Sequence, residues 1–545
     1  MIELHHTTVF DAFRDSAQRY ARLPFLHILG ETAQIYGVPA GTCTYGEALA
    51  EVERLAGIYR RVGYGHGHRA GLLLENRPAF FFHWLALNSL GVSTVPINAD
   101  MRSAELEYLV DHSGICVAVT LSDRAGDLRA AATKTGRELV IATPETIAGL
   151  GTAPFPPPDA AAPGVDTECG LLYTSGTTGR PKGCVLPNEY YLLAGEWYDG
   201  IGGMCTVRPG EDRLITPLPM VHMNAMACST MAMILAGGCI VPLDRFHPKT
   251  WWQSVRESRS TIVHYLGVMP SMLMVAEPSP SDREHQVRFG FGAGVDKRLH
   301  APFEARFGFP LLEAWAMTET GMGAVVIANR EPRHVGTACF GRPEPRVQLR
   351  VVDDTGNDVG ADVPGELLVR AAGPNPRRGF FREYLKDPEA TAEAWAGGWF
   401  HTGDVVTRDA AGYCYFVDRK KNVIRRNGEN IAAVEVESVL RQHPLVRQVA
   451  VAAAPDPVRG DEVLACVIPA EPIGADRAAA AAADITAFCL RQLAYYKAPG
   501  YVAFVDSLPL TATQKLQRGE LNALARGLPG TPGCVDTRHL KKRQS

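Results

Sequence analysis

Short apolar runs alternate with longer amphipathic stretches in the first part of the chain. Residues 45–62 carry apolar side chains at helical spacing, and apolar runs occupy 69–74, 115–121 and 138–142. Short buried strands separated by amphipathic helices are typical of helices packed on a largely parallel sheet. The same pattern returns from 214 to 309, so the sequence predicts one large α/β region.

Two further changes in pattern predict a small β-subdomain and a separate C-terminal domain. Residues 347–353 and 365–370 have the composition of strands on either side of a turn-rich stretch. After the charged group Asp418-Arg419-Lys420-Lys421, a new alternation of helices and strands begins. We therefore predict an α/β fold with a large N-terminal domain of layered sheets and helices over 1–420. A small α+β domain over 421–530 and a tail over 531–545 are expected to follow it.

The composition indicates a folded protein without a broad basic surface. The 545 residues are 46% hydrophobic and 21% charged, and 55 basic side chains nearly balance 59 acidic ones. This balance argues against nucleic acid as a partner, and the short basic run 539–543 is typical of a frayed terminus. The twelve cysteines are scattered without metal-ligand spacing, which favours buried thiols in a reducing compartment.

One apolar stretch is long enough to be compared with a membrane span. Residues 223–243 contain no formal charge, and about 20 apolar residues can cross a bilayer. Gly237 and Gly238 interrupt the stretch, however, and many of its residues are small or polar. We expect a buried helix followed by a buried strand and no membrane span. The start of the chain lacks the pattern of a secretory signal, so a cytoplasmic protein is expected.

The segment TSGTTGRPKG, residues 174–183, has the composition of a phosphate-binding loop. It follows a predicted apolar strand and combines hydroxyl side chains, glycines and one lysine, namely Thr174, Ser175, Gly176, Thr177, Thr178, Gly179, Lys182 and Gly183. Glycines allow backbone N–H groups to point inward, hydroxyls add donors, and lysine adds positive charge. The spacing differs from that of a Walker A loop, since only two residues separate Gly176 from Gly179.

This loop resembles the signature of the adenylate-forming superfamily, which contains acyl-CoA synthetases, the adenylation domains of peptide synthetases and the beetle luciferases. Further stretches resemble the family's other motifs in the same order: PLPMVH at 217–222, GAG at 292–294, EAWAMTE at 313–319, WFHTGD at 399–404, DRKKNVIRRNGENIAAVEVE at 418–437 and PLTATQKLQR at 509–518. On these seven collinear motifs the chain is identified as a member of the superfamily, most similar to an acyl-CoA synthetase.

The resemblance implies an ATP site assembled from several of these motifs. The loop would hold the β- and γ-phosphates, the GAG turn and Trp315 would lie against adenine, and Asp404 with Arg419 would bind the ribose hydroxyls. Thr318 would donate to phosphate and Glu319 would reach a Mg²⁺ ion, which usually binds carboxylates, phosphates and water. The implied ATP-binding residues are Thr174, Ser175, Gly176, Thr177, Thr178, Lys182, Gly292, Ala293, Gly294, Glu313, Trp315, Thr318, Asp404 and Arg419.

The family's chemistry has two half-reactions. A substrate carboxylate attacks the α-phosphorus of ATP and releases pyrophosphate, and Lys515 would stabilise the charge that develops. The C-terminal domain then rotates about a hinge, here Lys421, and the thiol of coenzyme A attacks the acyl adenylate. Asn427, Gly428 and Glu429 would line the tunnel for its pantetheine, and Gly428 would allow a close backbone approach. The implied catalytic residues are Lys515, Thr318, Glu319 and His222.

Three positions depart from the family's pattern. Trp315 replaces the usual tyrosine of the adenine motif, Ala316 replaces glycine, and Gln514 stands where glycine is most common. A tryptophan can still stack on adenine with a broader face, whereas Ala316 adds a methyl group near the site. ATP binding is therefore expected to survive, with a reshaped acid pocket.

The acid pocket is expected to be mainly apolar. Its implied residues are His222, Met223, Met317, Gly321 and Met322, and flexible, polarisable methionines suit bulky apolar ligands. The alternative for such methionines is an ordinary core, and the alternative for His222 is a buried, hydrogen-bonded side chain. Peptide-synthetase domains place an Asp just after the second motif to bind an amino acid's ammonium group, and no acidic residue stands there. A medium-to-large aromatic, fatty or polycyclic acid is the predicted substrate.

The leading hypothesis is an ATP-dependent carboxylate–CoA ligase that uses ATP, Mg²⁺ and coenzyme A. One alternative within the superfamily is an enzyme that loads an acyl carrier protein, and another is a carnitine-type betaine CoA ligase. A catalytically silent nucleotide-binding protein is a third alternative, against which Lys182, Glu319, Asp404 and Lys515 all count. The sequence leaves open the identity of the acid, the acceptor thiol and the oligomeric state, with a homodimer among the alternatives.

Overall fold

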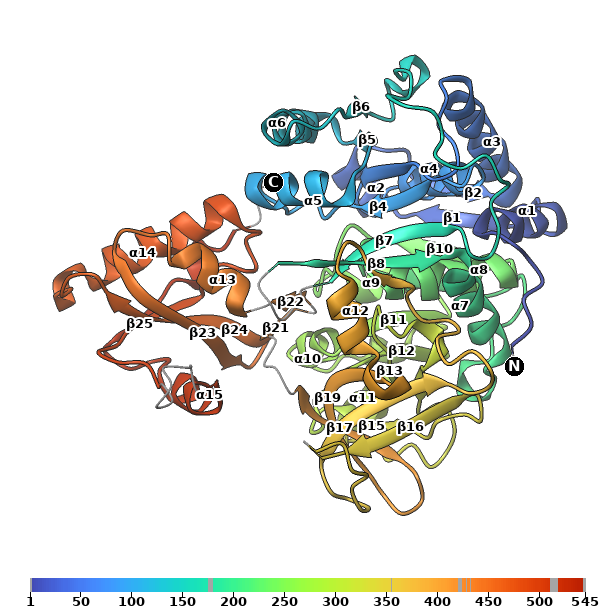
Figure 1. Cartoon of the computed structure of the whole chain (residues 1–545). Helices are drawn as coiled ribbons and strands as arrows, with labels where there is room; N and C mark the ends of the chain where they lie inside the picture. Colours follow the sequence, from blue (N-terminus) through green and yellow to red (C-terminus); the bar gives the residue numbers. More distant parts are fainter. Residues whose placement is uncertain are drawn as a thin grey trace. The chain divides into compact units, whose positions relative to one another are not determined.

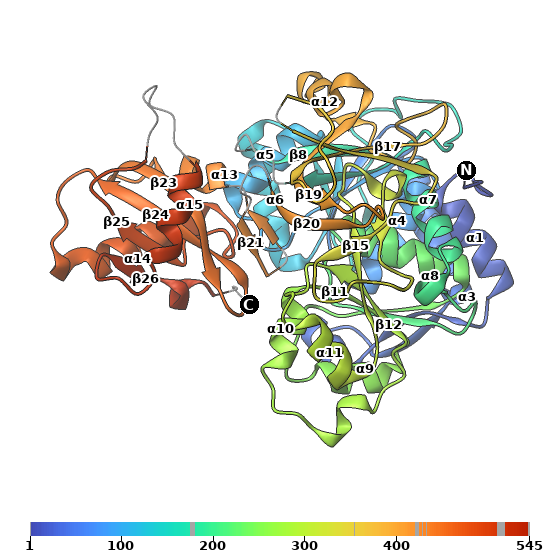
Figure 2. The same ribbon diagram turned by 90° about the horizontal axis from the view of Figure 1, so that it is seen from below.

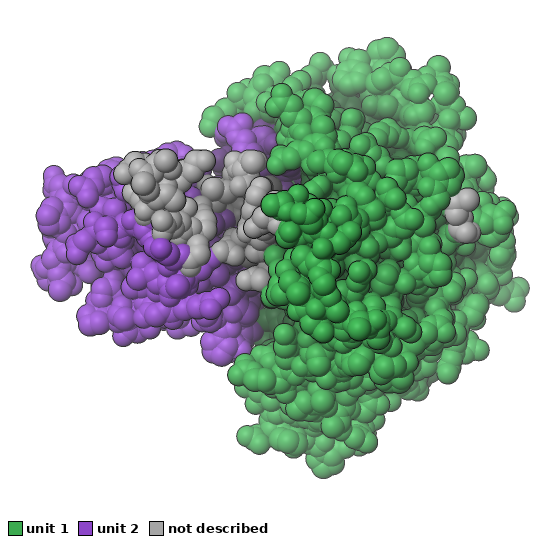
Figure 3. Space-filling view, turned by 60° about the horizontal axis from the view of Figure 1, so that its bottom comes forward, with its two compact units in different colours: residues 1–99, 110–173, 183–418 green, residues 100–109, 174–182, 419–545 purple. Residues whose placement is uncertain are grey.

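The structure is a computed structural model that describes residues 2–174, 180–353, 355–419, 424–427, 429–431, 433–509 and 518–542. Its internal contacts divide the chain into two compact units, coloured separately in Figure 3. Unit 1 comprises residues 1–99, 110–173 and 183–418, and unit 2 comprises residues 100–109, 174–182 and 419–545.

A seven-stranded sheet carries the start and end of the predicted phosphate loop on neighbouring strands (Figure 1). Its strand order is β18 (Glu383–Tyr384), β8 (Lys182–Pro187), β7 (Glu168–Thr174), β4 (Ser93–Pro96), β3 (Arg69–Leu73), β5 (Val117–Thr120) and β6 (Val140–Ala142). The strands from β7 to β6 pair in parallel. The parallel sheet predicted from the apolar runs is therefore confirmed.

An eight-stranded sheet carries the predicted adenine motifs on its parallel central strands. Its order is β14 (Val326–Ile327), β13 (Leu311–Trp315), β12 (Phe289–Ala293), β11 (Ile262–Leu266), β9 (Arg213–Thr216), β10 (Cys239–Pro242), β1 (Pro24–Ile28) and β2 (Gly41–Thr44). The pairs from β13 to β1 are parallel. Because the carboxyl ends of parallel strands meet at one edge, the segments after β12 and β13 lie close together.

Helices of unit 1 flank these two sheets (Figure 1, Figure 2). Their bounds are α1 (Val9–Arg19), α2 (Gly30–Tyr36), α3 (Tyr45–Arg61), α4 (Pro78–Asn88), α6 (Ala125–Thr135), α7 (Asn188–Gly200), α8 (Thr230–Ala236), α9 (Trp251–Ser258), α10 (Val268–Met274), α11 (His300–Phe307) and α12 (Pro388–Ala394). The helix predicted over 45–62 is α3, which begins with a capping box. Thr44 Oγ1 accepts from the Glu47 N–H at 3.2 Å, and Glu47 Oε2 accepts from the Thr44 N–H at 2.8 Å.

The uncharged stretch 223–243 forms a buried helix followed by a buried strand, as predicted. A π-helical turn, η4 (Asn224–Ser229), leads into α8, and Gly237 ends the helix in the left-handed region with φ 63°. The buried strand β10 follows. Among the described residues, no helix is both long enough and apolar enough to span a bilayer.

The predicted β-subdomain is a five-stranded sheet. Its order is β15 (Cys339–Gly341), β20 (Cys414–Arg419), β19 (Phe400–Arg408), β17 (Gly365–Ala371) and β16 (Val347–Val352). The pairs β16–β17 and β17–β19 are antiparallel. Ribose-motif residue Asp404 lies on its strand β19, while Arg419 is the last residue of β20.

Unit 2 has its own sheet and its own hydrophobic core. The sheet runs β22 (Glu429–Ile431), β21 (Ile424–Arg426), β24 (Gly460–Pro469), β25 (Tyr501–Phe504) and β26 (Cys534–Asp536), and β23 (Val446–Asp456) pairs with β24. Its helices are α13 (Ala433–Leu440), α14 (Ala475–Gln492) and α15 (Arg518–Gly527), together with the first part of α5 (Ser103–Ser113). The alanine-rich run 477–483 lies inside α14 and is its first half.

The last described residues form part of this core, contrary to the expectation of a frayed basic end. Strand β26 pairs with β25, and the Lys541 side chain is fully buried. Its Nζ donates to Glu462 Oε1 and, at 3.2 Å, to the Tyr496 carbonyl. A buried acid partner, which no local pattern reveals, explains why a basic residue so near the end of the chain is ordered.

Candidate active site

The predicted phosphate loop connects β7 to β8. Thr174 is the last residue of β7 and Lys182 is the first residue of β8, while Ser175, Gly176, Thr177, Thr178 and Gly179 lie outside the described residues. Strands β7 and β8 therefore fix both ends of a short connection, which is the arrangement that a phosphate-binding loop requires.

Tyr108 of α5 contacts the end of this loop, and no sequence motif predicted it. Its hydroxyl donates to the Pro181 carbonyl at 2.9 Å, and the Arg180 guanidinium lies 5.4 Å from its ring centroid. All three residues belong to unit 2. Tyr108 lies on a helix outside the seven motifs, so no pattern in the sequence indicated that its side chain contacts the loop.

The glycine turn predicted to lie against adenine is held by Glu313. The Glu313 carboxylate accepts from the N–H groups of Gly294 and Val295 at 2.9 and 3.2 Å and from the Tyr265 hydroxyl at 2.9 Å. Burial raises the pKa of Glu313, and these three donors oppose the rise. Glu313 thus fixes the turn. Gly292 is also required here, because a Cβ at this position would lie 2.2 Å from the Tyr265 carbonyl oxygen.

Trp315 and Asp404, which belong to two different motifs, meet directly. The Trp315 indole Nε1–H donates to Asp404 Oδ2 at 2.9 Å, and both side chains are buried. The Asp404 N–H donates to Thr402 Oγ1 at 3.0 Å, which fixes the backbone of β19 at this point. The tryptophan that replaces the family's tyrosine therefore positions the ribose-motif carboxylate, a role that stacking alone did not predict.

Glu319, the predicted metal ligand, lies beside a second tyrosine. Its Oε1 accepts from the Tyr384 hydroxyl at 3.1 Å, and its backbone carbonyl accepts from the Phe381 N–H at 2.9 Å. The neighbouring Thr318 carbonyl accepts from Tyr190 at 2.9 Å. The described residues form no group of three or more His, Cys, Asp or Glu side chains that could hold a metal. One carboxylate does fit Mg²⁺ when ATP phosphates and water supply the other oxygens.

Residues of the predicted acid pocket differ in burial. Met322 is 2% exposed and packs in the core, whereas His222, Met223 and Met317 are partly exposed. Gly321 has φ 48°, and a Cβ there would lie 2.3 Å from the Tyr190 ring and 2.6 Å from the Gly379 carbonyl oxygen. The glycine is thus required by packing.

The groups predicted for the second half-reaction lie in unit 2. Asn427 is in the left-handed region with φ 50°, its N–H donates to the Arg459 carbonyl at 3.1 Å, and Glu429 begins β22. Lys421, Gly428, Gln514 and Lys515 lie outside the described residues, and so does the side chain of Arg419. The roles of these residues stay predictions.

Comparisons with known proteins account for this arrangement of motifs. A family described as AMP-binding enzyme matches residues 13–385, and the AMP-binding enzyme C-terminal domain matches residues 435–515. The chain is an AMP-binding enzyme. The adenylate-forming superfamily inferred from the seven motifs is therefore confirmed, as is its two-part fold.

Curated relatives of this AMP-binding enzyme include CoA ligases of similar length. The chain is 30% identical over 494 residues to crotonobetaine/carnitine–CoA ligases of Shigella flexneri and of Escherichia coli O45:K1. Each alignment covers 88% of this chain and 92% of the relative.

Solved structures of similar fold include CoA ligases and an amide bond synthetase. A double mutant of o-succinylbenzoate CoA synthetase from Bacillus subtilis superposes with a TM-score of 0.77 at 23% identity, covering 94% of this chain and 97% of the other. Amide bond synthetase McbA from Marinactinospora thermotolerans gives 0.77 at 22% identity over 94% and 99%. A malonyl-CoA ligase gives 0.72 at 27% identity over 90% and 97%.

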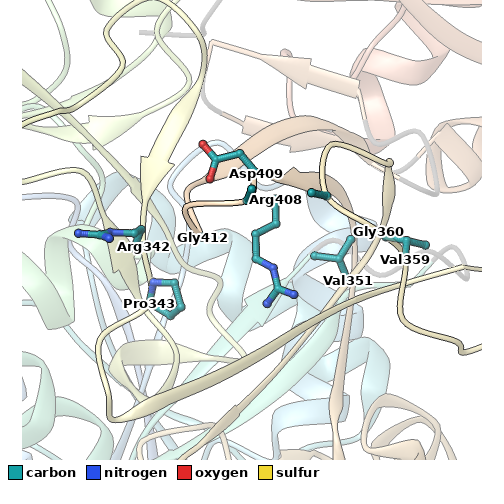
Figure 4. A pocket seen from close by; sticks show the side chains of 10 residues that line it. Arg342, Pro343, Val351, Val359, Gly360, Arg408, Asp409 and Gly412 are labelled. Carbon is teal, nitrogen blue, oxygen red and sulfur yellow. The ribbon is translucent and has the colours of Figure 1, made fainter.

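A surface hollow of this AMP-binding enzyme lies in the β-subdomain, apart from the motifs (Figure 4). Arg342, Arg408 and Asp409 line it together with small and apolar residues such as Val351 and Gly360. None of the predicted site residues is among its lining residues. The hollow therefore gives no reason to move the site away from the ends of β12 and β13 and the middle of β19.

Proposed function

We propose that this AMP-binding enzyme is an ATP-dependent ligase that joins a medium-to-large, mainly apolar carboxylic acid to coenzyme A. The observation that carries the proposal is the ordered set of groups on β13 and β19 and in the segments that follow β12 and β13. The glycine turn is held by Glu313, the ribose-motif carboxylate Asp404 is held by Trp315, and Glu319 lies beside Tyr384. CoA ligases that match 88% of the chain support the same activity.

In the first half-reaction, an oxygen of the substrate carboxylate attacks the α-phosphorus, and pyrophosphate leaves with its bonding electrons. Asp404 accepts hydrogen bonds from the ribose hydroxyls, and the turn after β12 receives adenine, so the α-phosphate is held in a fixed place. Lys515 stabilises negative charge on the phosphoryl oxygens, and Lys182 with the hydroxyls of the loop binds the outer phosphates. Glu319 would hold a Mg²⁺ ion, which would supply further positive charge near the phosphates.

In the second half-reaction, the thiol sulfur of coenzyme A attacks the acyl carbonyl carbon, and AMP leaves. Unit 2 carries Asn427 and Glu429, proposed to line the pantetheine tunnel with Gly428, and Lys421 is the proposed hinge. Rotation at this hinge would move Lys515 away from the acyl adenylate and bring the pantetheine tunnel to it. The same bound intermediate would then be used in both half-reactions.

The test is pyrophosphate release from Mg·ATP with a panel of carboxylic acids, each with and without coenzyme A. An apolar acid that turns over steadily only with coenzyme A is the expected result. Lys515→Ala should lower adenylation about a hundredfold, while Lys249→Ala, at an exposed lysine of unit 1, should not change it. Adenylation that coenzyme A does not accelerate would indicate a carrier protein as the acceptor, and an unchanged rate in Lys515→Ala would refute the mechanism.

A second candidate substrate is a quaternary-ammonium acid, because the relatives at 30% identity are crotonobetaine/carnitine–CoA ligases. Such a substrate buries a permanent positive charge, which costs free energy unless an anion or aromatic face meets it. The last residue of the second motif, His222, and the two that follow it, Met223 and Asn224, include no acid. Carnitine and crotonobetaine belong in the panel, and preferred turnover of either would replace the apolar acid.

A further inference from the structure

A chain of buried hydrogen bonds fixes the side chain of Asn224 at the start of the π-helical turn η4. His264 of β11 is fully buried, and its Nε2 lies 2.9 Å from the Tyr198 hydroxyl. Its Nδ1 lies 2.7 Å from Asn224 Oδ1 and 2.8 Å from Ser229 Oγ. The Tyr198 and His264 rings are stacked with centroids 5.6 Å apart. Three segments distant in the sequence thus meet at one imidazole.

The donors of this chain can be assigned one by one. Burial lowers the pKa of His264 to about 3 and raises that of Tyr198, so the imidazole is neutral and the phenol keeps its proton. The Tyr198 O–H donates to Nε2, which leaves the single imidazole N–H on Nδ1. The Ser229 hydroxyl donates to the Asn224 carbonyl at 3.0 Å. The Nδ1–H therefore donates to Asn224 Oδ1.

This assignment decides which way the Asn224 amide faces. If the amide were turned over, its Nδ2–H₂ group would meet the Nδ1–H group of His264, and two donors would oppose each other. With Oδ1 held inward, Nδ2 is turned away from His264, and Asn224 is partly exposed. No acceptor within the described part of the chain is hydrogen-bonded to Nδ2. A fixed neutral donor is thus available to a ligand.

The position of this donor relates it to the acid substrate. Asn224 directly follows His222 and Met223, the predicted wall of the acid pocket. The turn that begins at Asn224 is π-helical, and its Ser229 and Thr230 hydroxyls each donate to the carbonyl five residues earlier. Single π-helical turns are frequent at functional sites.

We infer that the acid activated by this enzyme carries a neutral hydrogen-bond acceptor, such as a hydroxyl, keto or ether oxygen, that binds Asn224 Nδ2. The inference rests on the proposed ligase function and narrows its substrate class. Asn224 is the specificity-determining residue, and His264 is a positioning residue that acts through it. An acid that lacks the oxygen leaves the amide donor unpaired in the pocket, which lowers its kcat/KM about 10- to 100-fold.

The experiment compares acids matched in size that differ by one oxygen. Methoxy and ethyl derivatives of phenylacetate, phenylpropanoate and cinnamate, and keto fatty acids beside their parent acids, are assayed for kcat/KM of pyrophosphate release. In the native enzyme the best acid should be the oxygen-bearing member of its pair, by about 10- to 100-fold. In Asn224→Leu, which keeps the volume and removes the amide, that preference should fall to about one while KM for ATP stays unchanged.

The role of His264 has a matched control elsewhere in the core. His264→Phe removes the N–H that orients the amide and should reduce the oxygen preference without changing KM for ATP. His83 is likewise fully buried, its pKa is lowered to about 3 by burial, and its Nδ1 lies 2.7 Å from the Tyr59 hydroxyl. His83→Phe should cost similar stability in thermal unfolding and leave the preference intact.

The possible outcomes distinguish a failure of the Asn224 inference from a failure of the proposed ligase function. Turnover in which no oxygen-bearing acid is preferred, or a preference that Asn224→Leu retains, overturns the inference alone. Equal loss of preference in His264→Phe and His83→Phe overturns the positioning role. Failure of every acid to release pyrophosphate overturns the proposed function and the inference together.

Discussion

Buried carboxylates are held differently at the candidate site and in unit 2. At the site, Glu313 accepts from Tyr265 and from two backbone N–H groups, Asp404 accepts from the Trp315 indole, and Glu319 accepts from Tyr384. These donors are neutral. In these contacts each carboxylate is oriented by an uncharged group.

In unit 2, buried carboxylates accept from buried cations. Lys497 Nζ donates to Glu105 and Glu435 at 2.7 and 2.9 Å. Arg426 Nε donates to both oxygens of Glu462 at 2.9 and 2.8 Å, and Lys541 also donates to Glu462. Each of these carboxylates thus has a buried basic group as its donor, and these contacts join distant segments of unit 2 and hold its fold. The described donors thus differ between the two regions: they are neutral groups at the candidate site and basic side chains in unit 2.

The largest effect is expected from Lys497→Met in unit 2. The change leaves Glu105 and Glu435 buried without their cation, so the free energy of unfolding should fall by about 3–5 kcal/mol. Denaturant unfolding measures it. Arg54→Met, which removes an exposed pair with Glu51, should cost at most about 1 kcal/mol. A loss in Lys497→Met as small as that of the control would show that the cluster is not structural.

The same Glu→Gln change should act on different properties in the two regions. Glu462→Gln leaves Arg426 and Lys541 uncompensated and should lower stability by about 3 kcal/mol. Glu319→Gln keeps an oxygen for Tyr384, so stability should hardly change, while pyrophosphate release should fall about a hundredfold. Unfolding curves and rates are measured on both variants. The two regions would not differ as proposed if Glu319→Gln lowered the stability. The same conclusion would follow if Glu462→Gln lost activity but kept its stability.

Trp315→Phe tests whether a neutral donor orients the ribose-motif carboxylate. An aromatic ring remains, but Asp404 loses its indole donor, and KM for ATP should rise about tenfold. With 2′-deoxy-ATP the rise should be smaller, because one of the ribose hydroxyls that Asp404 would accept from is already missing. Equal changes for both nucleotides would mean that Trp315 acts on adenine and not through Asp404.

The smallest effect concerns the two buried lysines of unit 2. Burial would lower the pKa of Lys497, but Glu105 and Glu435 raise it overall. Burial and Arg426 together lower the pKa of Lys541 to about 7, against the effect of Glu462. The unfolded chain, with a lysine pKa of about 10.4, then binds more protons than the folded one between about pH 7 and pH 10. Lys541 therefore makes stability rise with pH in that window.

Lys541→Met isolates this contribution. The difference in unfolding free energy between the native enzyme and the variant should increase by at most about 1.4 kcal/mol per pH unit from pH 7 to pH 10. Buffered denaturant titrations at several pH values measure it. A difference that does not vary with pH would show that Lys541 keeps an ordinary pKa.

The sequence predicted the features that depend on a regular apolar pattern or on a family motif. Apolar alternation predicted the parallel sheets, and Gly237 marked the end of α8 inside an apolar stretch. The motif order predicted the family. The domain boundary at 420 and the roles of Lys421 and Lys515 stay predictions.

Contacts between distant residues were beyond what the sequence could predict. Lys497 and Glu105 are 392 positions apart, and Trp315 and Asp404 are 89 apart, so no local period connects them. Glu313 was assigned to ATP binding from its motif, whereas the structure shows it holding the glycine turn. The fixed orientation of the Asn224 amide depends on a tautomer of His264, which only the assembled hydrogen bonds reveal.

Because Trp315 is hydrogen-bonded to Asp404, tryptophan fluorescence can serve as a probe of the candidate site. Indole emission responds to the polarity around its N–H, and this N–H points at the carboxylate proposed to receive ribose. The chain has seven tryptophans, and Trp315→Phe supplies the spectrum of the other six. We expect the difference between the two emission spectra to change when ATP binds, so that binding could be followed before any acid is identified.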